Sequence, residues 1–239
     1  MPWMRLPKIW TKGTAFIVGG GPSVAKVTNE EWLQMAGRWN VLGCNVAMWK
    51  IPHGVVRYGL FGDKPFLKAF QTQVQEFMSR GGRVIDVTGR PDETKIPWIQ
   101  ELQSSMWRVK RLNRADNWGI LLDDPKTSDP TAVCWNRSVG GCAINVAVNL
   151  GAKQIVLIGF DMQMLGKNHN FHSEYKEHYS SGSLPEPGPT HYKKHFLQPF
   201  PKIAERLKEL NIPCWNTCED SALKEFPYRP LAEFIRWPV

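Results

Sequence analysis

Short apolar runs alternate with amphipathic stretches along most of the chain, and this alternation predicts strands and helices in turn. Apolar runs that end at Gly, Asn or Asp are typical of buried strands, whereas apolar residues spaced near 3.6 are typical of helices that cover a sheet. Regular alternation of the two predicts one α/β domain over residues 1–239, doubly wound around a mainly parallel sheet. The strands are expected at 14–18, 40–44, 57–61, 82–87, 154–159 and 212–216, and the main helices at 65–79, 139–150, 200–210 and 231–235.

Two stretches lack this periodicity. Residues 89–131 are polar and carry scattered tryptophans, which favours an irregular insertion within the domain. Residues 162–190 are rich in His, Ser, Gly and Pro. A non-periodic segment of that length is typical of a functional loop, so we expect a histidine-rich lid there.

Composition narrows the class of protein. With 239 residues, 42% hydrophobic and 22% charged, the chain fits one globular domain and not a disordered one. Its apolar runs are far shorter than the roughly 20 residues of a membrane span. The N-terminus has no apolar stretch typical of a signal peptide, so we expect a cytoplasmic protein. Five cysteines without paired spacing favour reduced thiols.

The formal net charge of +8 points to anionic partners. A basic surface concentrates polyanions, whether nucleic acid, an anionic membrane face or a nucleotide. Lys and Arg occur singly or in pairs such as Lys193–Lys194. A solvated surface with a modest positive excess therefore explains the charge equally well.

A glycine-rich loop follows the first predicted strand and consists of Gly19, Gly20, Gly21, Pro22 and Ser23. Glycines let a backbone approach a phosphate closely, and successive N–H groups near a helix start form an anion site. The loop has neither the P-loop pattern nor the full dinucleotide fingerprint. A tight turn without a ligand is the alternative.

Polar residues also end the next two predicted strands. Asn45 follows the second strand and Asp63 the third. At the carboxyl edge of a parallel sheet such side chains reach a ligand crevice and can bind a sugar or a base. Both residue types are equally common in ordinary turns.

Asp161 ends the most apolar strand, and five of the six histidines lie between residues 169 and 195. Asp161, His169 and His172 form one candidate set of metal ligands. A general base on a mobile loop is the second interpretation, because histidine is the side chain whose ordinary pKa lies nearest neutrality. Solvated loop histidines are the third.

The ordered motifs together resemble a known group of enzymes. The chain is similar to bacterial sialyltransferases that use CMP-sialic acid, and to a wider Rossmann-like superfamily that includes archaeal hydroxymethylpterin pyrophosphokinase-like enzymes and many tailed-phage proteins. The phage group is the most similar, through residues 159–162, the cluster from His169 to His172, and residues 220–227. The motifs that carry the resemblance are Gly19 to Ser23, Cys44–Asn45, Ser138 to Gly140, residues 150–161, and His191–Tyr192 with His195.

The resemblance implies a role for each matching residue. It makes His195 the general base that deprotonates an acceptor hydroxyl, and Tyr192 a group that holds the leaving phosphate. In the hypothesis that we draw from it, Asp63 or Asp161 orients a sugar or the acceptor. The resemblance also implies that no metal is needed. The histidine cluster nevertheless keeps a divalent metal as an alternative for this chain. The residues expected to contact the nucleotide donor or its sugar are Gly19 to Ser23, Asn45, Asp63, Ser138, Gly140 and Gly141.

The resulting hypothesis is a glycosyltransferase that moves a sugar from a nucleotide-sugar donor to an acceptor hydroxyl. A phage-type enzyme that modifies DNA or nucleotides is one form of it. A metal-dependent phosphotransferase or pyrophosphotransferase is an alternative, as is a nucleic-acid-binding module with a degenerate site. Gly20, where the family usually has a polar residue, and Val139, where it has a small hydroxyl residue, depart from the family pattern.

Overall fold

Seven strands form the central sheet of the computed structural model, in the order β5-β4-β3-β2-β1-β8-β9, and every pairing is parallel. The structure describes residues 3–37, 40–88, 97–113, 116, 118–122, 129–164, 170–175 and 189–235. The strands of this sheet are β1 (Ala15–Val18), β2 (Asn40–Cys44), β3 (Tyr58–Phe61), β4 (Arg83–Asp86), β5 (Trp107–Arg108), β8 (Ile155–Ile158) and β9 (Cys214–Asn216).

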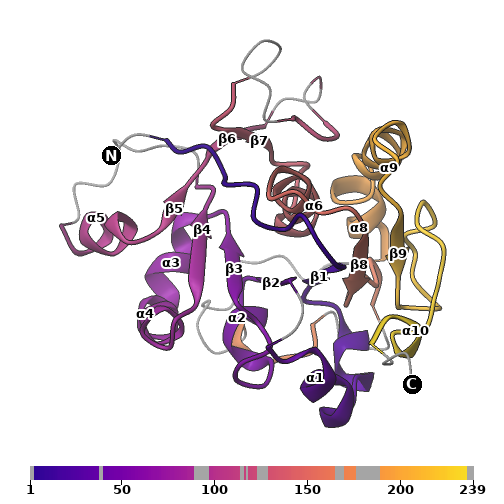
Figure 1. Ribbon diagram of the computed structural model, residues 1–239, viewed down its shortest axis with the longest axis horizontal. Coiled ribbons are helices and arrows are strands. Elements are labelled where there is room, and N and C mark those ends of the chain that lie inside the picture. The colour runs from indigo at the N-terminus through magenta and orange to yellow at the C-terminus, as the bar shows by residue number, and fades with distance from the viewer. Residues whose placement is uncertain are drawn as a thin grey trace.

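Helices cover both faces of the sheet (Figure 1). In the described part of the chain, no helix is long and apolar enough to cross a membrane. The helices are α1 (Asn29–Met35), α2 (Ala47–Lys50), α3 (Lys64–Ala69), α4 (Gln71–Ser79), α5 (Pro97–Ser104), α6 (Val139–Asn149), α8 (Pro189–His195), α9 (Phe200–Glu209) and α10 (Ala232–Ile235), with a 3₁₀ turn at Pro22–Lys26.

The chain winds outward from β1 in two directions. It runs from β1 through β2, β3 and β4 to β5 on one side, then returns to place β8 and β9 on the other. This confirms the predicted doubly wound α/β fold. Because β1 lies between β2 and β8, the strand order reverses there, and ligands of such sheets bind at the carboxyl ends of the strands beside that reversal.

Alternate residues of each buried strand face different helices. Ile17 and Leu157 belong to the core under α6 and α9, whereas Phe16 and Val156 belong to the core under α1, α2, α3 and α4. Successive side chains of a strand point to opposite faces, so a strand covered on both sides reads as a continuous apolar run. That is why the central strands were visible in the sequence.

The stretch 89–131 is more regular than we expected. Its described part contains α5, β5 and β6 (Lys110–Leu112), and β5 extends the main sheet by pairing with β4. The buried Asp86 carboxylate secures this edge, because it accepts a 2.6 Å hydrogen bond from Gln103 Nε2 and lies 3.5 Å from Arg108 Nε. Strands of two or three residues are too short to show a period, which explains the error. The helix predicted at 65–79 is likewise divided, at Phe70, into α3 and α4.

A second, two-stranded parallel sheet joins β6 to β7 (Ala132–Cys134) beside α6. Asn145 of α6 holds it in place. Its Oδ1 accepts a 2.7 Å hydrogen bond from the Cys134 N–H, and its Nδ2 donates to the Leu121 carbonyl at 2.8 Å. Since Asn145 is fully buried, these bonds replace water for every group involved.

All five cysteines are free and buried. Burial raises the pKa of the Cys44 and Cys134 thiols to about 12. Burial, together with the nearby Asp161 carboxylate, raises the pKa of Cys218 to about 11. These thiols are therefore protonated and unreactive at neutral pH.

Replacing Asn145 by Ala should lower the free energy of unfolding by about 2–3 kcal/mol, because the buried Cys134 N–H loses its acceptor. Asn149→Ala is the matched control. Asn149 Nδ2 shares the Leu121 carbonyl with Asn145 and otherwise bonds its own helix, so its loss should cost about 1 kcal/mol or less. Urea denaturation measures both values, and equal losses would refute this role of Asn145.

Candidate functional site

The glycine loop after β1 is joined to the end of β8 by a buried carboxylate. Asp161 Oδ2 accepts a 2.7 Å hydrogen bond from Ser23 Oγ, and Oδ1 accepts a 3.1 Å bond from the Ser23 N–H. Cys218 Sγ lies 3.4 Å from Oδ1 as a third donor. Asp161 has no exposed surface. The sequence placed both residues at the mouth of the sheet, and the structure brings them together as a pair that fixes the loop.

Two glycines are required because the loop lies directly on β8. A Cβ at Gly21 would lie 2.0 Å from Asp161 Oδ2, and one at Gly19 would lie 2.7 Å from the Gly159 carbonyl oxygen. Real Cβ atoms do not approach so closely. Gly20 differs, since the nearest atom to its Cβ would be Asn170 Oδ1 at 3.1 Å.

Three N–H groups of this loop, those of Gly19, Gly21 and Ser23, donate to acceptors within the protein. The Gly19 N–H donates to the Ile158 carbonyl at 2.7 Å, and the Gly21 N–H donates to the Gly159 carbonyl at 2.9 Å. The Ser23 N–H and O–H are both directed at Asp161. On its other side the loop contacts the segment 170–175, because the Gly20 carbonyl accepts a 3.1 Å bond from the Phe171 N–H.

Asn45 lies beside this loop, at the end of β2. Its backbone is left-handed, with φ of 52°, and its Nδ2 donates to the Tyr175 hydroxyl at 3.1 Å. Its Oδ1 is buried and has no hydrogen-bond partner among the residues that the structure describes. An unsatisfied buried acceptor costs free energy, so a ligand that donates a hydrogen bond there would be stabilised. The described residues 170–175 of the expected lid thus lie over Gly20 and Asn45.

Asp63 caps a helix. Its Oδ1 accepts a 2.8 Å hydrogen bond from the Phe66 N–H at the start of α3. Burial raises the pKa of its carboxyl group, against the opposing effects of that bond and of the Arg111 charge. Arg111 Nη1 donates to the Gly62 carbonyl, and the guanidinium stacks 4.7 Å from the centre of the Trp135 ring. The structure therefore gives Asp63 a structural role beside a cation at the carboxyl edge.

The first turn of α6 reaches the same edge. Ser138 is its N-cap, and its Oγ accepts a 3.0 Å hydrogen bond from the Gly141 N–H. A Cβ at Gly140 would lie 2.9 Å from the Phe160 ring, so this glycine lets the helix pack on the end of β8. Gly141 similarly makes room for Asn136, because a Cβ added at Gly141 would lie 2.8 Å from the Asn136 Cβ. The Ser138 hydroxyl still has its proton to donate.

The helix α8 brings Tyr192 and His195 to this edge. Burial, and then the Asp161 charge, raise the pKa of the Tyr192 phenol, so this ring lies within electrostatic reach of the glycine loop. His195 is exposed and lies three residues further along the helix, on a neighbouring position of its surface. The Lys194 carbonyl accepts a 3.2 Å bond from Arg137 Nη1, which joins α8 to the loop before α6.

The proposed metal ligands do not assemble in the described residues. Asp161 already accepts three hydrogen bonds, and His172 lies between aromatic rings, 5.0 Å from Phe171 and 4.7 Å from Tyr175 by ring centroids. His169 lies outside the described residues. Within the described part of the chain, no three His, Cys, Asp or Glu side chains are placed to hold a metal ion.

Sequence reasoning missed four residues of this site: Arg111, Arg137, Tyr175 and Cys218. Arg111 lies in a strand too short to be recognised, and Tyr175 lies in the stretch read as a lid. Nothing in the local sequence of Cys218 indicates Asp161, which is 57 positions away. The adjacent Lys110 and Arg111 are one of the charge pairs in the sequence, and a pair of that kind does not by itself indicate a site.

Two solved structures from Campylobacter jejuni are similar to this chain. The monofunctional α-2,3-sialyltransferase Cst-I shares 15% identity with a TM-score of 0.58, covering 91% of this chain and 80% of its own. The sialyltransferase CstII, in complex with the substrate analogue cytidine-5'-monophosphate, shares 12% identity with a TM-score of 0.52, covering 95% and 88%. The chain has a sialyltransferase-like fold. No protein-family model matches it, and no curated protein is similar to it in sequence.

Gly21→Ala should destabilise the protein by about 1–3 kcal/mol, because the new methyl group collides with the Asp161 carboxylate and the Gly159 carbonyl. Gly20→Ala, one position away, should change stability by less than about 0.5 kcal/mol. Thermal and urea denaturation of the two variants measure the difference. A tolerated alanine at position 21 would contradict the packing described here.

Proposed function

We propose that the chain transfers a sugar from a nucleotide-activated donor to an acceptor hydroxyl. The observation that carries this proposal is the sialyltransferase-like fold over about nine-tenths of the chain, with the candidate residues gathered at the reversal point of its sheet. One CstII structure contains CMP and a trisaccharide acceptor, which supports a cytidine nucleotide as the first donor to test.

The donor would lie across the carboxyl ends of β1, β2 and β8. Gly20 offers a surface without a side chain, and the buried Asn45 Oδ1 would accept a hydrogen bond from a donor hydroxyl or amine. The Ser138 hydroxyl would contact the ribose or base. The N–H dipoles at the first turn of α6 would favour the negative phosphate nearby.

The reaction we propose is a displacement at the anomeric carbon. His195 takes the proton from the acceptor hydroxyl as its oxygen forms a bond to that carbon. The bond from the carbon to the phosphate oxygen breaks, and the nucleotide leaves with the electron pair. This needs one base and a group that stabilises the departing phosphate.

Tyr192 would stabilise that phosphate by donating a hydrogen bond. Burial and the Asp161 charge raise the pKa of its phenol, so the ring keeps its proton at neutral pH and can donate. Asp161 contributes to this step indirectly. It fixes Ser23 through hydrogen bonds, and its charge disfavours the ionised form of Tyr192. We assign Asp161 to positioning and not to proton transfer.

His195→Ala should lower kcat about 100-fold or more, because removing a general base typically costs at least that factor. The affinity for the donor should stay the same, since His195 contacts the acceptor. His53→Ala is the control, because His53 is also exposed but precedes β3 at the opposite edge of the sheet. Steady-state kinetics with CMP-sialic acid, or with the donor that thermal shifts select, test this; unchanged turnover in His195→Ala would refute the assignment.

Thermal denaturation with nucleotides should identify the donor. A nucleotide at 100 times its Kd stabilises the folded state by about 2.7 kcal/mol, so we expect CMP to raise Tm more than UDP, GDP or ATP. The shift should persist in EDTA. Stabilisation by ATP that requires a divalent metal would instead favour the phosphotransferase alternative and contradict the glycosyltransferase.

A further inference from the structure

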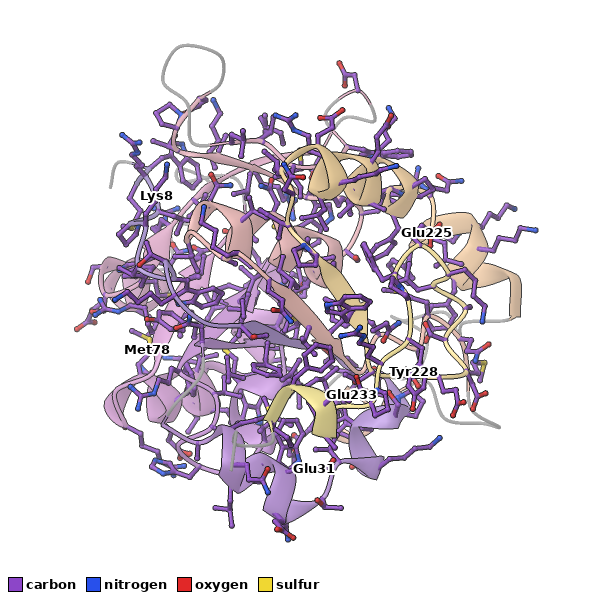
Figure 2. The ribbon with its side chains drawn as sticks, turned by 45° about the vertical axis from the view of Figure 1, so that its right-hand side comes forward. Lys8, Glu31, Met78, Glu225, Tyr228 and Glu233 are labelled. Carbon is purple, nitrogen blue, oxygen red and sulfur yellow. The ribbon has the colours of Figure 1, made fainter. Side chains whose placement is uncertain are left out.

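A groove of about 830 Å³ lies at the opposite edge of the sheet from the candidate active site. Its walls come from the residues that precede β3 and β4, from the end of α4, and from β5. Figure 2 shows Lys8 and Met78, which border these lining segments in sequence, on the side of the molecule away from Glu225 and Tyr228. The residues that line the groove include none of those assigned to the candidate active site.

Positive charge dominates this groove. Four exposed residues with cationic side chains line it, namely Lys50, Arg57, Arg80 and Arg83. The Lys50 ammonium is ion-paired with Glu174, which lies outside the lining, so the three arginines supply most of the positive charge. Glu76 is the one carboxylate among the lining residues, and its Oε2 lies 3.8 Å from Arg80 Nη2. The cations come from separate elements, so the sequence shows them only as dispersed charge. Charges gathered in a concave surface attract anions more strongly than the same charges spread out.

Aromatic rings form part of the same wall. Tyr58 and Trp107 line the groove, with ring centroids 6.2 Å apart, and neither is fully buried. The Arg83 guanidinium lies 4.9 Å from the centre of the Trp107 ring. Trp10 packs edge-on against Tyr58 at 5.1 Å and fixes that ring from behind. Tyr58 and Trp107 are the first residues of β3 and β5, so the sheet holds both rings in place.

Two glycines leave part of the groove wall without side chains. Gly54 and Gly81 have φ of 85° and 89°, and a Cβ at either would meet no atom within 4 Å. Both line the groove. The open space beside them lets a ligand approach the backbone closely.

We propose that this groove binds a single strand of nucleic acid. A strand supplies regularly spaced phosphates for Arg57, Arg80 and Arg83 and flat bases for Trp107 and Tyr58, which is the combination that single-strand-binding grooves use. A small phosphorylated compound would use only part of the charge, and an anionic membrane surface would not use a concave wall. The inference does not depend on the proposed glycosyl transfer.

The test measures binding of a fluorescein-labelled oligo(dT) of about ten nucleotides by fluorescence anisotropy at low salt. The double variant Arg80→Glu/Arg83→Glu should weaken binding about tenfold or more, because it removes two phosphate contacts and adds repulsion. The control is Lys153→Glu/Lys208→Glu. It changes the net charge equally, at exposed residues near the start of β8 and the end of α9, away from the groove. Binding by the control should change less than about twofold.

Further measurements separate the alternatives. If Arg80→Glu/Arg83→Glu does not fold, as judged by its thermal transition, Arg80→Gln/Arg83→Gln replaces it. Equal losses in the two charge-reversed pairs, or no binding by the unmodified protein at low salt, would overturn the proposal. So would equal affinity for an abasic oligonucleotide of the same length, or binding to phosphatidylglycerol vesicles in place of oligo(dT). The Tm shift with CMP should be unchanged in the groove variants, so a failure of one proposal is distinguishable from a failure of the other.

Discussion

The two hydrogen bonds from Ser23 to the buried Asp161 carboxylate fix the part of the fold on which the candidate site depends. They join the loop after β1 to the end of β8, where the strand order reverses. Without them the buried carboxylate would lose its strongest donors, and a buried charge without donors is costly. The absence of side chains at Gly19 and Gly21 follows from the same contact, because the loop and the strand end lie too close for a Cβ. Burial, and then the charge of the same carboxylate, raise the pKa of the Tyr192 phenol.

Much of the fold was predictable because the central strands are buried on both faces. Ile155–Ile158 and Ala15–Val18 are continuous apolar runs, and such runs need no knowledge of distant contacts to be recognised. β5, β6 and β7 have two or three residues each and are held by partners far along the chain, among them Asp86 and Asn145. Local periodicity carries no information about such contacts.

The sequence indicated which residues belong to the candidate site, but it did not indicate what each of them does there. Glycines and polar residues at strand ends drew attention to Ser23, Asp63 and Asp161. Ser23 and Asp161 are 138 positions apart, so their pairing is visible only in three dimensions. Asp63 proved to be a helix cap, a role that its position before Lys64–Ala69 also fits. The groove could not be predicted for the same reason. Its cationic residues come from separate elements, and only the folded sheet brings them together.

The burial of all five cysteines has a practical consequence for measuring motion in this protein. Protonated thiols inside the core react slowly with maleimides, so the natural protein offers almost no background to thiol labelling. A single cysteine introduced on the exposed face of α8 would then carry a dye or spin label by itself. The chain is thus ready for spectroscopy that follows α8 against the sheet, without first removing any native residue.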